Sequence, residues 1–185
     1  MKWPLQCIAL LILVDWLCAP AAAALLHIDR SKSKIEVAVN STVSSFTGKL
    51  ENYQAVIECD PPQRLPTKAE VIFDFKDLKT GVGGRDEHML KWLQYPKTPK
   101  GSFFLRDWKQ NGAESLAQGE LTIHGIQRTI QMPVIVKRQT DAYDIVGTVG
   151  LDYRDFGLPR IRNALVFSVD PHLKIKFHLI GKIGD

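Results

Sequence analysis

The sequence has few cysteines, little net charge and no apolar run of membrane-spanning length. Two of its three cysteines, Cys7 and Cys18, lie near the N-terminus, so Cys59 is alone in the rest of the chain and has no disulfide partner there. The formal net charge is only +4, with acids and bases interspersed, which argues against a nucleic-acid partner. The longest apolar run, residues 5–14, has ten residues, whereas a membrane-spanning helix needs about 20.

The sequence also lacks the usual motifs of catalytic and metal sites. It has no Gly-x-Ser-x-Gly elbow, and Cys59 lies in an alternating stretch, where a cysteine is typically a small buried hydrophobe. Asp86, Glu87 and His88 are adjacent, so on a helix they point in different directions and do not form a metal site. We therefore expect no catalytic residue, no metal and no cofactor apart from a bound ligand.

The N-terminus has the pattern of an export signal. Lys2 precedes the apolar run, and the small residues of 20–24 follow it, which is the order of a secretory signal peptide. We expect residues 1–24 to be that signal peptide and residues 25–185 to form one domain. An uncleaved anchor or lipidation at Cys18 is a weaker alternative, because the apolar run is short and the residues before this cysteine are unsuitable.

Alternation of apolar and polar residues predicts β-strands over most of this domain. Ile35, Val37 and Val39 share one face of a first strand, and later segments repeat the pattern. The apolar positions shift parity near Glu51 and Asn52, which predicts a bulge. About eight antiparallel strands without β-α-β alternation predict an all-β barrel or sandwich. An eight-stranded up-and-down barrel is wide enough to hold one small ligand.

One stretch, residues 78–93, departs from the alternation. Glycines first break the strand pattern, and Met89, Trp92 and Leu93 then fall on one side of a helix. We expect one short helix between the third and fourth strands. Its aromatic side should face inward, with the helix lying across the open end of the barrel.

Three segments resemble motifs of the YceI-like family, in the same order along the chain. They are Thr80-Gly81 followed by Arg85-Asp86-Glu87-His88-Met89, then Gly119-Glu120-Leu121-Thr122-Ile123-His124-Gly125, and finally Tyr153-Arg154-Asp155-Phe156-Gly157. The resemblance covers residues 27–182 and implies a lipocalin-like barrel. It further implies an exported, periplasmic protein that sequesters or carries a long isoprenoid or quinone-type lipid and catalyses no reaction.

The candidate ligand-binding residues are inward-facing apolar side chains and two polar residues at the start of the helix. Burial of each methylene stabilises a bound chain by about 0.8 kcal/mol, so a prenyl tail needs no specific polar contacts. Arg85 and His88 are the candidates for binding a head group. The apolar candidates are Phe46, Phe73, Phe75, Met89, Trp92, Phe104 (or its neighbour Phe103), Leu121, Met132, Leu151, Tyr153 and Phe177.

Two other functions remain open at this stage. In the first, the aromatic side chains fill a dry core, and the protein is an envelope stress or interaction module with a filled barrel. In the second, the protein is a hydrolase of an envelope or isoprenoid substrate, which requires His88 or His124 to lie beside a base or a nucleophile.

The polar candidates also have structural interpretations. Arg85 can pair with a carboxylate while Asp86 caps the helix. The basic loop that contains Arg154, Asp155, Arg160 and Arg162 is expected to be a turn held by a local arginine–carboxylate pair; the alternative is contact with an anionic head group or a membrane surface. The oligomeric state is open, with a Cys59-linked dimer among the options.

Overall fold

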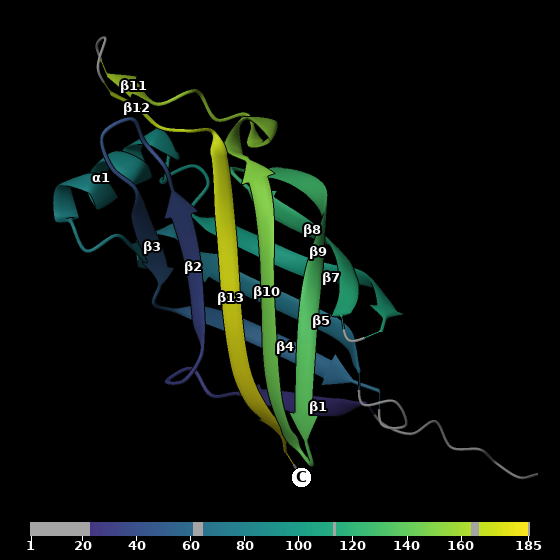
Figure 1. Cartoon of the computed structure of the whole chain (residues 1–185). Helices are drawn as coiled ribbons and strands as arrows, with labels where there is room; N and C mark the ends of the chain where they lie inside the picture. The colour runs from purple at the N-terminus through teal and green to yellow at the C-terminus, as the bar shows by residue number, and fades with distance from the viewer. Residues whose placement is uncertain (1–22, 61–64, 113, 164–166, 185) are drawn as a thin grey trace, which may run out of the picture.

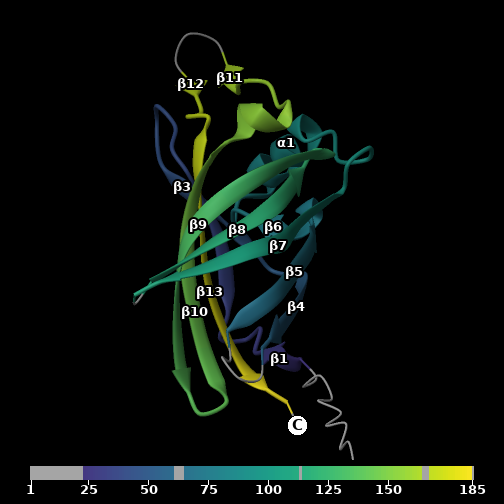
Figure 2. The same cartoon turned by 90° about the vertical axis from the view of Figure 1, so that its right-hand side faces the viewer.

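The computed structural model describes residues 23–60, 65–112, 114–163 and 167–184, so the signal peptide expected at residues 1–24 lies almost wholly outside them. The described chain forms a closed antiparallel β-barrel with one α-helix (Figures 1 and 2), which confirms the predicted all-β fold. In spatial order, the eight strands of the ring are β1 (Ala24–Ile28), β4 (Tyr53–Cys59), β5 (Pro66–Asp74), β7 (Lys100–Asn111), β8 (Glu114–Ile123), β9 (Ile126–Gln139), β10 (Ala142–Asp152) and β13 (His172–Ile183).

Three shorter strands, β2 (Lys34–Val39), β3 (Phe46–Leu50) and β6 (Leu78–Lys79), extend the wall from β13. Residues 181–183 of β13 pair with β1 and close the ring of eight strands. Residues 174–178 of β13 pair with β2, the first of the three added strands. Successive pairs of segments, β1 with β2, β3 with β4, and β5 with β6, therefore form the first three long strands of the barrel.

The helix α1 (Gly83–Trp92) lies between β6 and β7, near the end of the barrel opposite β1 (Figure 1). This is the expected place after the third long strand, although the structure divides those strands into six segments. Strand β1 itself was not predicted, because the recognised alternation began only at Ser33. None of the helices within the described residues has the length and apolar character that a membrane crossing requires.

The expected irregularity near Glu51 and Asn52 is the break between β3 and β4. Both residues are exposed, and the buried positions shift from Leu50 before the break to Tyr53 after it. The backbone N–H of Glu51 donates to the carbonyl oxygen of Asp77 (2.9 Å) instead of to a ladder partner. Two successive outward residues thus change the parity of the wall, as a bulge does.

Strands β9 and β10 separate partway along the barrel. β9 pairs with β8 from Ile126 to Val134 and with β10 from Val134 to Gln139, so it changes partner beside Pro133, which has no N–H to donate. A 3₁₀ helix, η2 (Tyr153–Phe156), covers the resulting gap: Phe156 is 1% exposed, and its carbonyl oxygen lies 3.3 Å from Nδ1 of His124 on the β8–β9 turn. The side wall is therefore closed by packing where the ladder ends.

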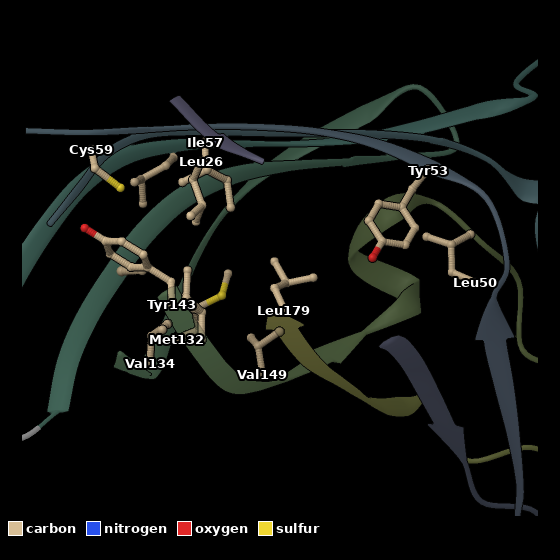
Figure 3. Packing of buried hydrophobic residues seen from close by; sticks show 13 residues of the cluster. Leu26, Leu50, Tyr53, Ile57, Cys59, Met132, Val134, Tyr143, Val149 and Leu179 are labelled. Carbon is tan, nitrogen blue, oxygen red and sulfur yellow. The ribbon is translucent and has the colours of Figure 1, made fainter. Parts of the chain in front are cut away.

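The end of the barrel at β1 is closed by a dry cluster, which we call the floor. It contains Leu26, Cys59 and Tyr143, with exposed fractions of 2%, 0% and 1%. The hydroxyl of Tyr143 points toward the thiol of Cys59 across the barrel (Figure 3). Burial raises the pKa of the Cys59 thiol and of the Tyr143 hydroxyl.

Candidate ligand-binding site

The barrel encloses an apolar cavity of about 590 Å³. This volume is in the range of small-molecule sites, which is roughly 300–1,000 Å³. The filled-barrel interpretation is therefore wrong, because the inward side chains leave space between them. Among the predicted residues, those that line the cavity are Phe46, Phe73, Phe75, Arg85, His88, Met89, Trp92, Leu121, Met132, Leu151, Tyr153 and Phe177.

The cavity is open because large rings lie against the wall over glycines. Phe73 faces Gly101 on the neighbouring strand, and Phe177 faces Gly147. A Cβ atom added at either glycine would collide with the facing ring, so each ring lies flat on the backbone of its neighbour. A third ring lies over Gly119 in the same way. The inward phenylalanines therefore coat the wall and leave the centre of the barrel free.

Phe104 does not line the cavity, so its prediction as a binding residue is wrong and the alternative, Phe103, holds the inward position. In β7, Phe103 shares parity with the buried Leu105, whereas Phe104 pairs with Glu70 and Glu120 on the outer face. The guanidinium carbon of Arg106 lies 5.8 Å from the ring centroid of Phe104 on that outer face.

The open end of the cavity, which we call the mouth, is formed by α1 and residues 158–162. Nε1 of Trp92 donates to the carbonyl oxygen of Pro159 (2.9 Å), and its ring meets that of Tyr153 edge-on at 5.0 Å. The hydroxyl of Tyr153 accepts a hydrogen bond from the backbone N–H of Ile161 (3.3 Å). The helix and the loop after η2 are thus fixed to each other, and the inward aromatic side of the helix agrees with its prediction.

The structural interpretations of Arg85 and Asp86 are both corrected. The guanidinium carbon of Arg85 lies 4.1 Å from the ring centroid of Phe46, and no carboxylate among the described residues forms an ion pair with it. Asp86 is 8% exposed and accepts hydrogen bonds from the N–H and hydroxyl of Thr80 (2.9 and 2.6 Å), so it fastens the segment that follows β6 to the helix. The N-cap position belongs to Val82, which has no side-chain acceptor.

Residues missed by the sequence analysis also line the cavity. Trp108 faces inward because a register shift between Leu105 and Asp107 reverses the parity of β7. Its Nε1 is buried without a hydrogen-bond partner among the described residues, which leaves a free donor deep in the wall. Arg160 and Arg162, expected only as members of a basic loop, line the mouth.

The turn that carries η2 is held by the local arginine–carboxylate pair that the sequence predicted. Nε of Arg154 donates to Oδ1 of Asp152 (2.9 Å), and the backbone N–H of Arg154 donates to the same oxygen (2.9 Å). The side-chain hydrogen bond from Arg154 lowers the pKa of Asp152 to about 2. This ion pair positions the loop that closes the gap between β9 and β10.

Comparison with known proteins supports the same architecture. The crystal structure of Burkholderia cenocepacia BcnA has a TM-score of 0.73 and 19% identity, covering 83% of this chain and 99% of that one. A polyisoprenoid binding domain from Saccharophagus degradans, implicated in plant cell wall breakdown, has a TM-score of 0.70 and 14% identity, covering 88% and 100%. The YCEI protein of Campylobacter jejuni has a TM-score of 0.64 and 16% identity, covering 77% and 87%.

At these identities the solved structures show the fold alone. No significant match was found among curated proteins. The sequence profile of the YceI-like domain, however, matches residues 26–180, which is nearly all of the described chain. The protein therefore belongs to the YceI-like family.

Proposed function

We propose that this protein is an exported carrier that sequesters or transports a long-chain isoprenoid, a polyprenyl or quinone-type amphiphile, inside its barrel. The observation that carries the proposal is the apolar cavity of about 590 Å³, which extends from the mouth to the inner side chains near the floor. Burial of a prenyl tail there is favourable along its whole length. The name of the Saccharophagus degradans structure, a polyisoprenoid binding domain, agrees with this ligand class.

The geometry favours binding over hydrolysis. A hydrolase would need His88 or His124 beside a base or a nucleophile. His124 faces the backbone carbonyl oxygen of Phe156, and His88 lies in the cavity wall and forms no side-chain hydrogen bond among the described residues. The described residues also contain no group of three His, Cys, Asp or Glu side chains placed to hold a metal ion. We propose that the ligand leaves the protein unchanged.

Export to the periplasm is the second part of the proposal. It is supported by the signal-peptide pattern of residues 1–24 and by the position of β1, which begins at Ala24 and pairs at once with Cys59. Cleavage after Ala24 would remove only the first residue of β1 and keep the pairs of Leu25 with Glu58 and of Leu26 with Ile57. The mouth would exchange lipid during transient contact with the membrane surface. Cys59 is 0% exposed, so a disulfide between two native chains is not part of the proposal.

The test is to express the full chain in a bacterium rich in quinones and polyprenols, purify it from the periplasmic fraction and extract it with organic solvent. Mass spectrometry should find a prenyl lipid in near-stoichiometric amount and an N-terminus close to Ala24. Absence of any prenyl lipid, or retention of the protein in the cytoplasm, would contradict the corresponding part of the proposal.

A glycine pair on β10 provides the matched control. Gly147→Ala pushes the Phe177 ring into the cavity, and such overpacking costs about 1–3 kcal/mol, so the bound lipid should fall by roughly tenfold or more. Gly150→Ala adds the same methyl group on the outer face, where the nearest atom is 3.9 Å away, and should keep its lipid. Equal lipid content in the two variants would show that the lipid is not held inside the barrel.

A further inference from the structure

One side of the outer wall carries lysines across four neighbouring strands. In the order of the sheet these strands are β13, β2, β3 and β6, and the first three are seen from outside in Figure 1. Alternate residues of these strands line the cavity, so the residues between them point outward. We call the outward lysines of this paired region, together with its one outward glutamate, the lysine face. Its members are Lys34, Glu36, Lys49, Lys79, Lys174 and Lys176.

The lysine face holds as much net charge as the whole protein. Five lysines against one glutamate give it a formal charge of +4, and the full sequence also has a formal net charge of +4. On the adjoining strand β10, the outward Asp144 is engaged by Nε2 of His178 (3.0 Å). Elsewhere on the outer wall acids accompany bases, as in the ion pair between Lys68 and Glu58 (2.8 Å). The excess positive charge is therefore gathered on one side of the barrel.

The lysines of the face are placed against the interest of the fold. Glu36 lies between Lys49 and Lys176 on the neighbouring strands, but among the described residues its ion pair is with Lys34 (3.6 Å). Lys49 is also directly opposite Lys79. Like charges directly opposite each other destabilise a sheet, so these positions are not explained by stability.

Protection of a sheet edge does not explain the lysines either. Lysines on an edge strand discourage pairing with another chain. Lys174 and Lys176, however, are on β13, which pairs with β10 and β2, and Lys34 is on β2, which pairs with β13 and β3. At least these three lysines therefore lie on strands without a free edge.

Exposed apolar side chains lie beside the lysine face at its mouth end. Val43 and Val82 are 68% and 50% exposed, the highest values for large hydrophobic side chains in the described part of the chain. Val43 is in the turn between β2 and β3, and Val82 follows β6 at the start of α1. The ring of Phe46, next to that turn, contacts Arg85 of α1, so both valines lie near the mouth. Apolar side chains flanked by basic ones favour binding to anionic membranes.

We propose that the lysine face docks on a membrane surface that contains anionic phospholipids, with Val43 and Val82 entering the interface beside the mouth. This inference rests on the proposed function, because a lipid carrier exchanges its ligand with a bilayer, and it names the surface that makes the contact. A lysine ammonium on its flexible stem suits the many mobile phosphates of a bilayer.

The composition of the face favours a bilayer over an acidic protein. Hot spots of protein interfaces are enriched in tryptophan, tyrosine and arginine. The four strands of the lysine face have none of these side chains pointing outward among their described residues.

The test measures sedimentation of the protein, purified from the periplasmic fraction, with phospholipid vesicles. The protein should bind vesicles of phosphatidylglycerol and phosphatidylcholine at least about tenfold more tightly than vesicles of phosphatidylcholine alone, because only the first carry net negative charge. This preference should shrink as salt is raised, since Lys34, Lys49, Lys174 and Lys176 are exposed to solvent.

Two double variants remove the same charge from different parts of the wall. Lys49→Gln/Lys176→Gln should weaken binding to the phosphatidylglycerol vesicles by about tenfold or more, since each lysine close to an anionic surface contributes about fivefold. Lys68→Gln/Lys109→Gln removes two charges from β5 and β7, where both lysines are in exposed ion pairs, and should keep nearly the wild-type affinity.

A valine pair tests the apolar part of the contact. Val43→Ser should weaken binding severalfold at every salt concentration, because apolar contacts are not screened. Val56→Ser changes an exposed valine on β4, away from the lysine face, and should leave binding unchanged.

The outcomes separate the docking surface from the carrier. Equal losses in the two double variants, or no binding to phosphatidylglycerol vesicles, would overturn the inference. Binding of poly-glutamate that requires Lys49 and Lys176, without binding to vesicles, would assign the face to an acidic protein and overturn it as well. The prenyl lipid extracted from both double variants should equal that of wild type, since the face lies outside the cavity. Absence of this lipid from all three proteins would remove the proposed carrier, whereas vesicle binding alone decides the docking surface.

Discussion

The two ends of the barrel are built by different means. At the floor, Leu26, Cys59 and Tyr143 are almost completely buried and hold the end closed by apolar packing. At the mouth, Trp92 and Tyr153 fix a helix to a loop through two hydrogen bonds and one edge-on ring contact. The three floor residues therefore take no part in the cavity wall, whereas the mouth adds Arg85, Arg160 and Arg162 to it.

This difference assigns stability and binding to separate places. Side chains surrounded on all sides by other atoms gain the full dispersion energy of close packing, whereas side chains that face a void gain only part of it. The floor therefore stabilises the fold, and the wall above it gives up part of that stabilisation to keep an interior free. A test of this difference makes the same substitution once in the floor and once in the cavity wall.

The largest effect is expected for a leucine of the floor compared with a leucine of the cavity wall. Leu26→Ala removes a side chain that is 2% exposed and should lower the free energy of unfolding by about 3 kcal/mol. Leu173→Ala removes a partly exposed side chain that already faces the cavity, and should cost only about 1 kcal/mol. Urea denaturation of both lipid-free variants measures the two costs, and equal costs would mean that the barrel has no void beside Leu173.

Much of the barrel wall was predictable from the sequence. Alternation with a period of two gave the wall, and nearly all the inward residues that it indicated do line the cavity. The error at Phe104 had a remedy in the sequence, since Gly101 and Leu105 have the parity of Phe103 and mark the inward positions of that strand. Trp108 had none, because the shift that turns it inward is a property of the pairing with β8.

The hollow interior depended on information that a single strand does not carry. Whether Phe177 lies flat or projects is decided by Gly147, which faces it only in the register of β10 with β13. The place of Arg160 in the cavity wall likewise depends on the bond between Trp92 and Pro159, which are 67 positions apart in the sequence. The one sequence feature that indicated a hollow interior was the presence of glycines at inward positions in the middle of strands, where aromatic rings can lie flat against the wall.

Acid should loosen the mouth through the loss of one ion pair. The pKa of Asp152 falls from 3.8 to about 2 in the folded protein, so this carboxylate stabilises the fold above about pH 4 and loses that contribution as the pH falls toward 2. The side chain of Arg154 is 41% exposed, so the contribution is only about 1 kcal/mol. Urea denaturation between pH 5 and about 2 should show this loss in wild type and not in Asp152→Asn.

Amide hydrogen exchange locates the same effect. The two proteins are compared at the same pH. Above about pH 4, the backbone amides of η2 should exchange faster in Asp152→Asn than in wild type, and near pH 2 the two exchange rates should be equal. Amides of β1 and β4 serve as the control, because they pair with each other at the floor and have no contact with this ion pair. A matching change in β1 would indicate that the two ends open together.

In wild type no reaction is expected at Cys59, because its thiol is closed off in the native protein. The side chain is 0% exposed, and burial raises its pKa, so a disulfide reagent at neutral pH finds neither access nor thiolate. Labelling then requires the floor to open, and its rate should follow the free energy of that opening. Leu26→Ala should therefore label about a hundredfold faster than wild type, while Trp92→Ala, which disrupts only the mouth, should label at nearly the wild-type rate. Faster labelling of Trp92→Ala would mean that the mouth supports the floor, and that stability and binding are not separated along the barrel.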